Sequence, residues 1–220
     1  MFVKICGVTS EEDALLAVAM GADAVGFIFA PSSRQVAAGL VRDIVRRLPP
    51  EVLTVGVFRD ESAQRVVDVI NGTGLRAAQL SGHEPAEQTV WIRKRVPFMI
   101  KGFAAGDPAL DRADDFGADA ILVDSHEPGS GEVFDWSLAE GAPLNRRVIV
   151  AGGLTPENVA EAIDAIRPWG VDVATGVEDL PGHKDPRKVR EFILNARRAD
   201  PPRYHGDDEA RPFDWQQEDS

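Results

Sequence analysis

Hydrophobic runs rich in β-branched residues recur along the chain and alternate with amphipathic stretches. The short runs predict strands at residues 2–7, 24–29, 53–58, 77–80, 98–103, 120–124, 148–153 and 171–175. Apolar residues spaced three and four apart predict helices at residues 11–20, 41–48, 63–71, 107–116, 156–166 and 186–198. The segments alternate with a period of about 20–30 residues, which is typical of repeated βα units around a parallel sheet.

The number of units decides between two α/β architectures. Eight strand candidates favour a single closed (β/α)8 barrel, the TIM barrel, for which roughly 200–250 residues suffice. A doubly wound open sheet is the alternative, but such sheets usually have about five or six strands. Gly21 and Gly117 each open a Gly-Ala-Asp-Ala segment between a helix and the next strand, and we expect both glycines to cap helices.

The end of the sequence differs in character from the rest. Residues 200–220 are proline-containing and strongly charged, without an apolar period. We therefore interpret residues 1–199 as one catalytic barrel domain and residues 200–220 as a flexible, disordered acidic tail. An uncommitted tail is the favoured interpretation; a docking motif for another chain is the alternative, and it would use the aromatic residues Tyr204, Phe213 and Trp215.

Composition narrows the range of partners. The 220 residues are 44% hydrophobic and carry 36 acidic against 24 basic side chains, a formal charge of −12. This acidic balance disfavours a nucleic-acid partner, because phosphate backbones require a basic face. We see no apolar run long enough to span a membrane and no signal peptide, and a single cysteine argues against a disulfide-stabilised secreted domain. We expect a cytoplasmic protein, monomeric, acting on a small molecule.

Two reactive side chains lie at predicted strand ends, where barrels place their chemistry. Cys6 is the only cysteine and ends the first strand; Asp124 ends the sixth. A lone cysteine is often just a small buried hydrophobe, and a strand-end aspartate is often a turn residue. Together, however, a thiol and a carboxylate on opposite sides of one rim suit a base and an acid that move a proton between adjacent carbons.

The ends of the last two strands predict a phosphate site. Gly152 and Gly153 allow the backbone to approach an anion closely, and Thr175 with Gly176 offers a second set of amides. Barrels often bind phosphate with these two loops, although tight turns would explain the glycines as well. Thr155 before Pro156 predicts a helix that begins there.

Charged residues within strands require partners in the barrel interior. Period-two alternation places Lys4 on the same face as Cys6, and a buried lysine needs a counter-charge. Strand eight is the neighbour of strand one in a closed barrel, so we expect Asp172 to pair with Lys4 and to be one of the substrate-binding residues. The ammonium would then favour the Cys6 thiolate. Lys101 either joins this interior layer or extends to the rim.

Two loops complete the candidate site. Arg34, after strand two, is the best candidate to hold a substrate carboxylate, since arginine matches that anion in bidentate fashion; a solvent-facing charge is the alternative. After Asp124, the glycine-containing segment at residues 129–136 suits a flexible cover over the site.

These segments resemble the phosphoribosylanthranilate isomerase family, barrel enzymes of tryptophan biosynthesis. The resemblance extends from residue 2 to residue 198, and its most specific element is KICG combined with GSG-x-x-FDW. The matching segments are KICG at 4–7, GADAVGFIF at 21–29, VGVF at 55–58, QL-G at 79–82, VDSHEPGSGEVFDWS at 123–137, AGGLTPENV at 151–159, DVATGVE at 172–178 and PGHKD at 181–185.

The resemblance implies an Amadori rearrangement that needs no cofactor and no metal. N-(5-phosphoribosyl)anthranilate would become 1-(o-carboxyphenylamino)-1-deoxyribulose 5-phosphate. Cys6 matches the general base that removes the proton from C2 of the sugar, and Asp124 matches the general acid that protonates the furanose oxygen. Arg34 matches the arginine near the anthranilate carboxylate. The phosphate site matches Gly152, Gly153, Thr175 and Gly176.

Three positions depart from the family pattern. Ser81 stands where the family often has histidine, so that side chain's role is lost or passes to His83. The loop at residues 31–35 is one residue shorter than usual, which leaves the register of Arg34 open. Pro128 replaces a glycine of the flexible segment, which should stiffen it.

Other functions remain open from the residues alone. A metal-dependent sugar-phosphate epimerase would need histidine ligands at strand ends, and none of the four histidines lies there. A decarboxylating ring-closing synthase would need lysine and glutamate at strand ends, and Lys101 keeps that reading open. A degenerate barrel that docks partners through its tail is the non-enzyme alternative, disfavoured by intact Cys6 and Asp124.

Overall fold

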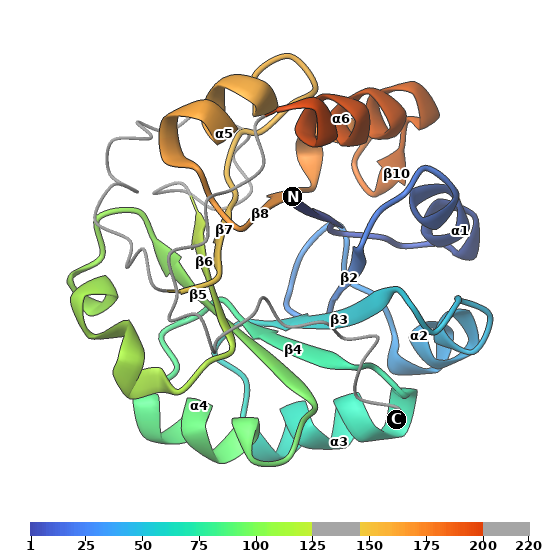
Figure 1. Cartoon of the computed structure of the whole chain (residues 1–220). Helices are drawn as coiled ribbons and strands as arrows, with labels where there is room; N and C mark the ends of the chain where they lie inside the picture. The colour runs from blue at the N-terminus through green and yellow to red at the C-terminus, as the bar shows by residue number, and fades with distance from the viewer. Residues whose placement is uncertain (125–145, 200–220) are drawn as a thin grey trace.

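Eight parallel strands form a closed barrel in the computed structural model, which describes residues 1–124 and 146–199. The strands pair in chain order, and β8 closes the ring by pairing with β1 (Figure 1). The predicted closed barrel is confirmed, and the open sheet is excluded. The strands are β1 (Phe2–Ile5), β2 (Ala24–Ile28), β3 (Leu53–Phe58), β4 (Ala77–Leu80), β5 (Phe98–Ala104), β6 (Ala120–Asp124), β7 (Val148–Val150) and β8 (Gly170–Val173).

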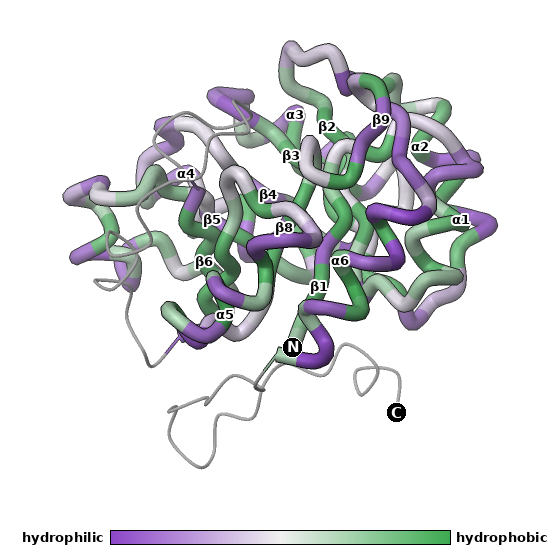
Figure 2. Tube along the Cα trace, turned by 90° about the horizontal axis from the view of Figure 1, so that it is seen from above, coloured by the Kyte–Doolittle hydropathy of each residue, from purple (hydrophilic) through white to green (hydrophobic). Residues whose placement is uncertain are grey.

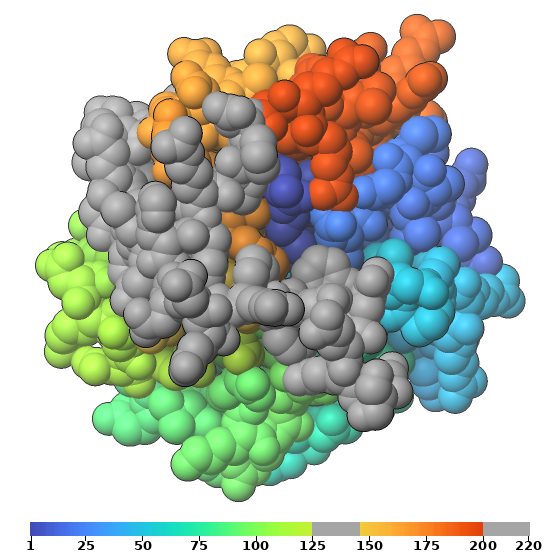
Figure 3. Space-filling model, in the orientation of Figure 1, coloured from blue at the N-terminus to red at the C-terminus, as the bar shows by residue number. Residues whose placement is uncertain are grey.

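Helices surround the strands (Figure 1), and successive segments of the chain follow one another around the surface of the molecule (Figure 3). A short 3-10 helix, η3 (Thr175–Val177), and a two-stranded hairpin, β9 (Glu178–Leu180) with β10 (His183–Lys184), lie between β8 and the last helix. The outer layer consists of α1 (Glu11–Ala19), α2 (Ala38–Val45), α3 (Ala63–Thr73), α4 (Ala86–Arg93), the 3-10 helix η1 (Pro108–Phe116), α5 (Val159–Ile166) and α6 (Pro186–Arg198).

The sequence pattern located most of these helices but missed α4, which buries only Thr89 and Ile92. The predicted glycine caps are partly confirmed. Gly117 caps η1 in the left-handed conformation with φ of 60°, whereas Met20 caps α1 and Gly21 follows it with φ of 95°. Both glycines adopt a backbone conformation that other residues rarely adopt.

Hydrophobic side chains fill the barrel and the layer between strands and helices, and the tube is strongly hydrophobic along central strands such as β6 (Figure 2). Phe2 and Trp169 stack with their ring centroids 4.4 Å apart at the beginning of β1 and just before β8. This stack closes the N-terminal end of the barrel interior, so that end is packed. The opposite end holds the polar side chains.

Lys101 is buried, but it does not join the interior layer. Its strand neighbours Met99 and Ile100 belong to the outer and inner clusters respectively, and alternation therefore places Lys101 on the helix-facing side. Its Nζ lies 2.9 Å from the buried carboxylate of Glu84 and donates to the carbonyls of Leu80 and Gly82 at 3.3 and 2.7 Å. The pair fastens the loop after β4 to β5.

The predictions about membrane spans, the domain boundary and the flexible cover have different outcomes. In residues 1–124 and 146–199, no helix is long and apolar enough to cross a membrane. The proposed boundary at residue 199 stays a prediction, because residues 200–220 lie outside the described residues. The flexible cover at residues 129–136, and the stiffening by Pro128, lie outside them too.

The buried pair gives a direct stability prediction. Replacing one partner, as in Lys101→Met or Glu84→Gln, leaves the other charge buried without its counter-charge, and should lower the free energy of unfolding by about 3–5 kcal/mol. The double variant should lose less than the sum of the two, since it leaves no unpaired charge. Urea unfolding of the four proteins measures this coupling, and additive losses would contradict it.

Candidate active site

A cavity of about 220 Å³ opens among the C-terminal ends of the strands. It brings together side chains from β1, β6 and β8 and loops from β2, β7 and β8. The predicted site residues that line it are Cys6, Arg34, Asp124, Gly152, Gly153, Asp172 and Thr175. Gly176 is adjacent in the chain to this lining but is not part of it.

Cys6 follows β1 and is 6% exposed, and Lys4 on the same face is fully buried. The Lys4 Nζ lies 3.0 Å from the Asp172 carboxylate, across the pairing of β1 with β8. This confirms the predicted ion pair and the predicted orientation of Lys4. The pair lies beside the thiol, so the charges of both Lys4 and Asp172 act on Cys6. Asp172 also lines the cavity.

The expected thiolate-favouring effect of Lys4 is outweighed. Burial raises the pKa of the Cys6 thiol above its ordinary value, and the Asp172 carboxylate adds to the rise, although Lys4 acts to lower it. For Lys4 the balance is the reverse: burial lowers its pKa, but Asp172 and Cys6 together outweigh burial and raise it. The thiol is therefore held protonated more firmly than an exposed cysteine.

Gly26 on β2 provides the space that these two side chains occupy. A Cβ at this position would lie 2.9 Å from the Cys6 Sγ, closer than real Cβ contacts, and 3.0 Å from the Lys4 Nζ, tighter than most of them. The inward-facing glycine in the strand thus belongs to the site, because it lets a lysine and a cysteine from β1 lie side by side.

Arg34 is at the rim, but Glu178 binds two of its three guanidinium nitrogens. Its Nε and Nη2 donate to the two carboxylate oxygens of Glu178 at 2.8 and 2.7 Å. The buried Lys184 also contacts this carboxylate, at 2.9 Å. Burial raises the pKa of Glu178, but the hydrogen bonds and charges of Arg34 and Lys184 outweigh it and lower that pKa. The sequence pattern did not indicate this cluster.

Gly7 explains how Arg34 fits against the first strand. A Cβ on Gly7 would lie 2.7 Å from the Arg34 Cδ, and the glycine has φ of 71°. The arginine side chain therefore lies across the backbone that follows Cys6, with Glu178 fixing its far end. Among the described residues, Nη1 is the guanidinium nitrogen left without a partner.

The loop after β7 differs from the prediction. The helix begins at Val159 and not after Thr155, because the Asn158 side chain accepts from the Thr155 amide at 2.7 Å and donates to the Gly153 carbonyl at 2.9 Å. These bonds hold the intervening residues in a turn. Gly152 and Gly153 have φ of 90° and 62°, so the loop is shaped by residues that tolerate this conformation.

Gly176 holds the two phosphate-candidate loops together. A Cβ there would lie 1.9 Å from the Leu154 carbonyl oxygen, so only glycine permits this approach. The structure therefore brings the loops after β7 and β8 into direct contact. It assigns Gly176 a packing role beside Thr175 in the wall of the cavity.

A second cavity, of about 440 Å³, adjoins the first at the ends of β4, β5 and β6. Arg59, Ser81 and Asp124 line both cavities, and His83 lines only the second. His83 is exposed, lies 3.4 Å from the Asp60 carboxylate and is not part of the lining of the first cavity, whereas Ser81 is.

A closed eight-stranded barrel with reactive groups gathered at the C-terminal strand ends defines a TIM-barrel enzyme. A family model described as N-(5'-phosphoribosyl)anthranilate (PRA) isomerase matches residues 3–195. The chain belongs to this family and is an isomerase.

Known members of this family are similar to the chain over about nine tenths of its length. The N-(5'-phosphoribosyl)anthranilate isomerase of Desulforudis audaxviator is 48% identical over 90% of this chain and 98% of its own length, and that of Thermotoga maritima is 43% identical over 89% and 98%. The Thermus thermophilus crystal structure is 43% identical with a TM-score of 0.83, covering 89% of this chain and 98% of its own.

One solved relative contains a ligand. A phosphoribosyl anthranilate isomerase in complex with reduced 1-(o-carboxyphenylamino)-1-deoxyribulose 5-phosphate is 41% identical, with a TM-score of 0.79 over 90% of this chain and 98% of its own. Another solved structure, 40% identical over 90% of this chain and 98% of its own with a TM-score of 0.79, shows monomers generated from the dimeric isomerase of Thermotoga maritima. The monomeric state expected for this chain stays a prediction.

Within residues 1–124 and 146–199, no three His, Cys, Asp or Glu side chains are grouped so as to hold a metal ion.

Gly26 provides the test of this geometry. Gly26→Ala adds a methyl group that must displace Cys6 or Lys4, so we expect the catalytic rate constant to fall by about tenfold or more while the fold persists. Gly39→Ala in α2 is the matched control, because nothing lies within 4 Å of its added Cβ. Unchanged turnover in Gly26→Ala would contradict the crowding.

Proposed function

We propose that the protein converts N-(5-phosphoribosyl)anthranilate to 1-(o-carboxyphenylamino)-1-deoxyribulose 5-phosphate in tryptophan biosynthesis. The observation that carries this proposal is that Cys6 and Asp124 line one cavity with the glycine loops after β7 and β8. Family membership and the reduced-product complex of a relative support it. The rearrangement moves protons only, so it requires neither a redox cofactor nor a metal.

Asp124 acts first as the general acid. Its carboxyl group protonates the furanose ring oxygen, the C1–O bond breaks, and the nitrogen lone pair forms a protonated Schiff base at C1. Asp124 is half-buried at the end of β6, in the wall shared by both cavities, which suits a carboxyl group that must carry a proton to substrate.

Cys6 acts second as the general base. Its thiolate removes the proton from C2, whose electrons form the C1–C2 double bond of an enolamine as the iminium charge is neutralised. Loss of the hydroxyl proton at C2 and gain of a proton at C1 then give the ketone. The raised pKa of the thiol makes the thiolate a stronger base once formed, at the expense of its abundance at neutral pH.

Anion-binding groups hold the two ends of the substrate. Gly152, Gly153 and Thr175 receive the phosphate, with Gly176 keeping the two loops together. Arg34 contacts the aryl carboxylate through Nη1, since Glu178 binds its other edge. Asp172 borders the sugar and fixes Lys4 beside the base.

The alternative synthase chemistry is disfavoured by the surroundings of Lys101. A catalytic lysine must deliver a proton or a charge to substrate, but the Lys101 ammonium makes three hydrogen bonds to protein groups. These use all of its donors. The Lys101 ammonium therefore stabilises the loop after β4.

The test is turnover of freshly prepared N-(5-phosphoribosyl)anthranilate, followed by loss of its fluorescence. We expect the wild type to be active, and Cys6→Ser and Asp124→Asn each to lose about a thousandfold or more in catalytic rate constant, because each removes a proton-transfer group. Arg46→Met on the exposed surface serves as the control. A folded but inactive wild type, or near-normal rates in either variant, would overturn the proposal.

A further inference from the structure

Gln79 has a buried polar atom that the protein leaves unsatisfied. The residue is on β4 and only 4% exposed, and it lines the same cavity as Cys6. Its Nε2 donates to the Ser81 hydroxyl at 3.0 Å, whereas its Oε1 has no hydrogen-bond partner within the described part of the chain. Buried acceptors are almost always paired, so an orphaned one in a cavity wall indicates a ligand that donates to it.

The position of Gln79 indicates which end of the substrate it meets. In the ring of eight strands, β4 lies opposite β8 and β3 lies opposite β7. A phosphate bound at the loops after β7 and β8 directs the rest of the molecule across the barrel mouth. The part farthest from the phosphate, the C1 carbon with its arylamine, therefore reaches the wall formed by β3 and β4.

Arg59 is the charged residue of that wall. It follows β3 directly, lines both cavities, and forms no hydrogen bond or ion pair with another residue of the described chain. Arg34, in contrast, is bound at two nitrogens by Glu178. The less committed guanidinium is therefore the one on the side of the cavity opposite the phosphate loops.

The chain after Arg59 is held in an uncommon conformation. Asp60 has φ of 54°, a left-handed value that is costly for a residue with a side chain. Its amide donates to the buried Glu84 at 2.9 Å, and its carboxylate accepts from the His83 amide at 2.6 Å. The Lys101–Glu84 pair thus fixes the turn that determines where Arg59 leaves the strand.

We propose that Gln79 and Arg59 form a subsite for the arylamine end of the substrate, which we call the β3–β4 wall. The amine N–H donates to the Oε1 of Gln79, and the ortho carboxylate accepts from the guanidinium of Arg59 as well as from the Arg34 Nη1. The inference rests on the proposed function and specifies how that site recognises an o-carboxyarylamine.

The β3–β4 wall also affects the rate of the reaction, through the charge that develops on the amine. When the ring opens, the amine becomes a protonated Schiff base, and its N–H becomes a charged, stronger donor. A neutral amide oxygen facing that N–H stabilises the intermediate more than the bound substrate. Gln79 therefore contributes to the catalytic rate constant, whereas Arg59 binds a carboxylate whose charge does not change and contributes to KM.

Two substrates and two variants separate these roles. With N-(5-phosphoribosyl)anthranilate, Arg59→Met should raise KM about tenfold with the catalytic rate constant unchanged. With N-(5-phosphoribosyl)aniline, which lacks the carboxylate, the same variant should match the wild type. Gln79→Met should lower the catalytic rate constant about tenfold with both substrates, since both have the N–H.

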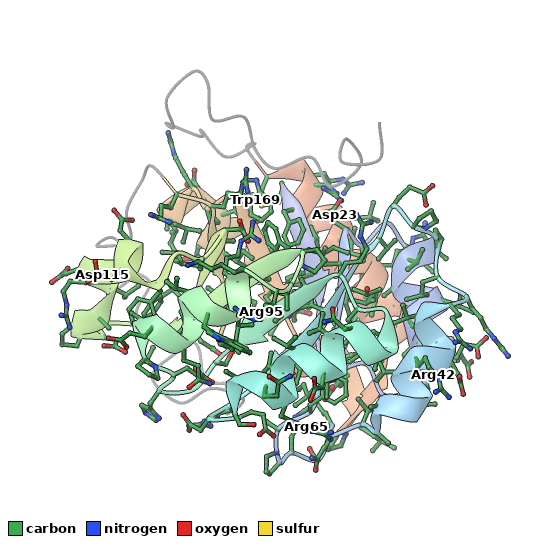
Figure 4. The ribbon with its side chains drawn as sticks, turned by 90° about the horizontal axis from the view of Figure 1, so that it is seen from below. Asp23, Arg42, Arg65, Arg95, Asp115 and Trp169 are labelled. Carbon is green, nitrogen blue, oxygen red and sulfur yellow. The ribbon has the colours of Figure 1, made fainter. Side chains whose placement is uncertain are left out.

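The controls distinguish this subsite from a structural role. Arg65→Met removes an exposed charge from α3 (Figure 4) and should leave both substrates unaffected. Gln79→Met removes an unsatisfied buried atom together with one hydrogen bond to the half-exposed Ser81, so its urea midpoint should stay close to that of the wild type while activity falls. Unchanged kinetics in either variant, or an equal KM rise with both substrates in Arg59→Met, would overturn the subsite. An inactive wild type overturns the proposed function, and this inference with it.

Discussion

The buried ion pair between Lys4 and Asp172 is the interaction on which the rest of the site depends. It joins the first strand to the last, so the same contact that closes the barrel also fixes the charges beside the only thiol. A charged lysine without exposure to water is costly unless it is paired, and the pair therefore requires the full ring of strands. Gly26 completes the arrangement by leaving room for Lys4 and Cys6 together.

A second buried pair, Lys101 with Glu84, organises the other half of the rim. It lies on the outside of the strands and acts through the backbone of the loops after β3 and β4, where Glu84 binds the Asp60 and Gly82 amides. The first pair thus sets the electrostatics of the base, and the second sets the shape of the opposite wall. Both are buried ion pairs, and each joins two neighbouring segments of the barrel mouth.

Period and alternation in the sequence were sufficient to predict the barrel, the inward direction of Lys4 and its pairing with Asp172. They could not show that burial outweighs Lys4 in setting the thiol pKa, because that balance depends on the packing around Cys6. Nor could they show that Glu178 binds Arg34, since the two residues are 144 positions apart. Gln79 was within reach: alternation along β4 places it inside, but an orphaned acceptor is visible only in three dimensions.

The most direct test of this account is the pH dependence of Cys6 alkylation by iodoacetamide in the folded protein. Only the thiolate reacts, and the chain contains a single cysteine, so the rate reports one group. Burial beside Asp172 raises the pKa, so the rate should still be rising above about pH 8.5, the ordinary thiol value, which the urea-unfolded protein should show. A plateau in the folded protein at or below the unfolded value would mean that Lys4 prevails over burial, contrary to this account.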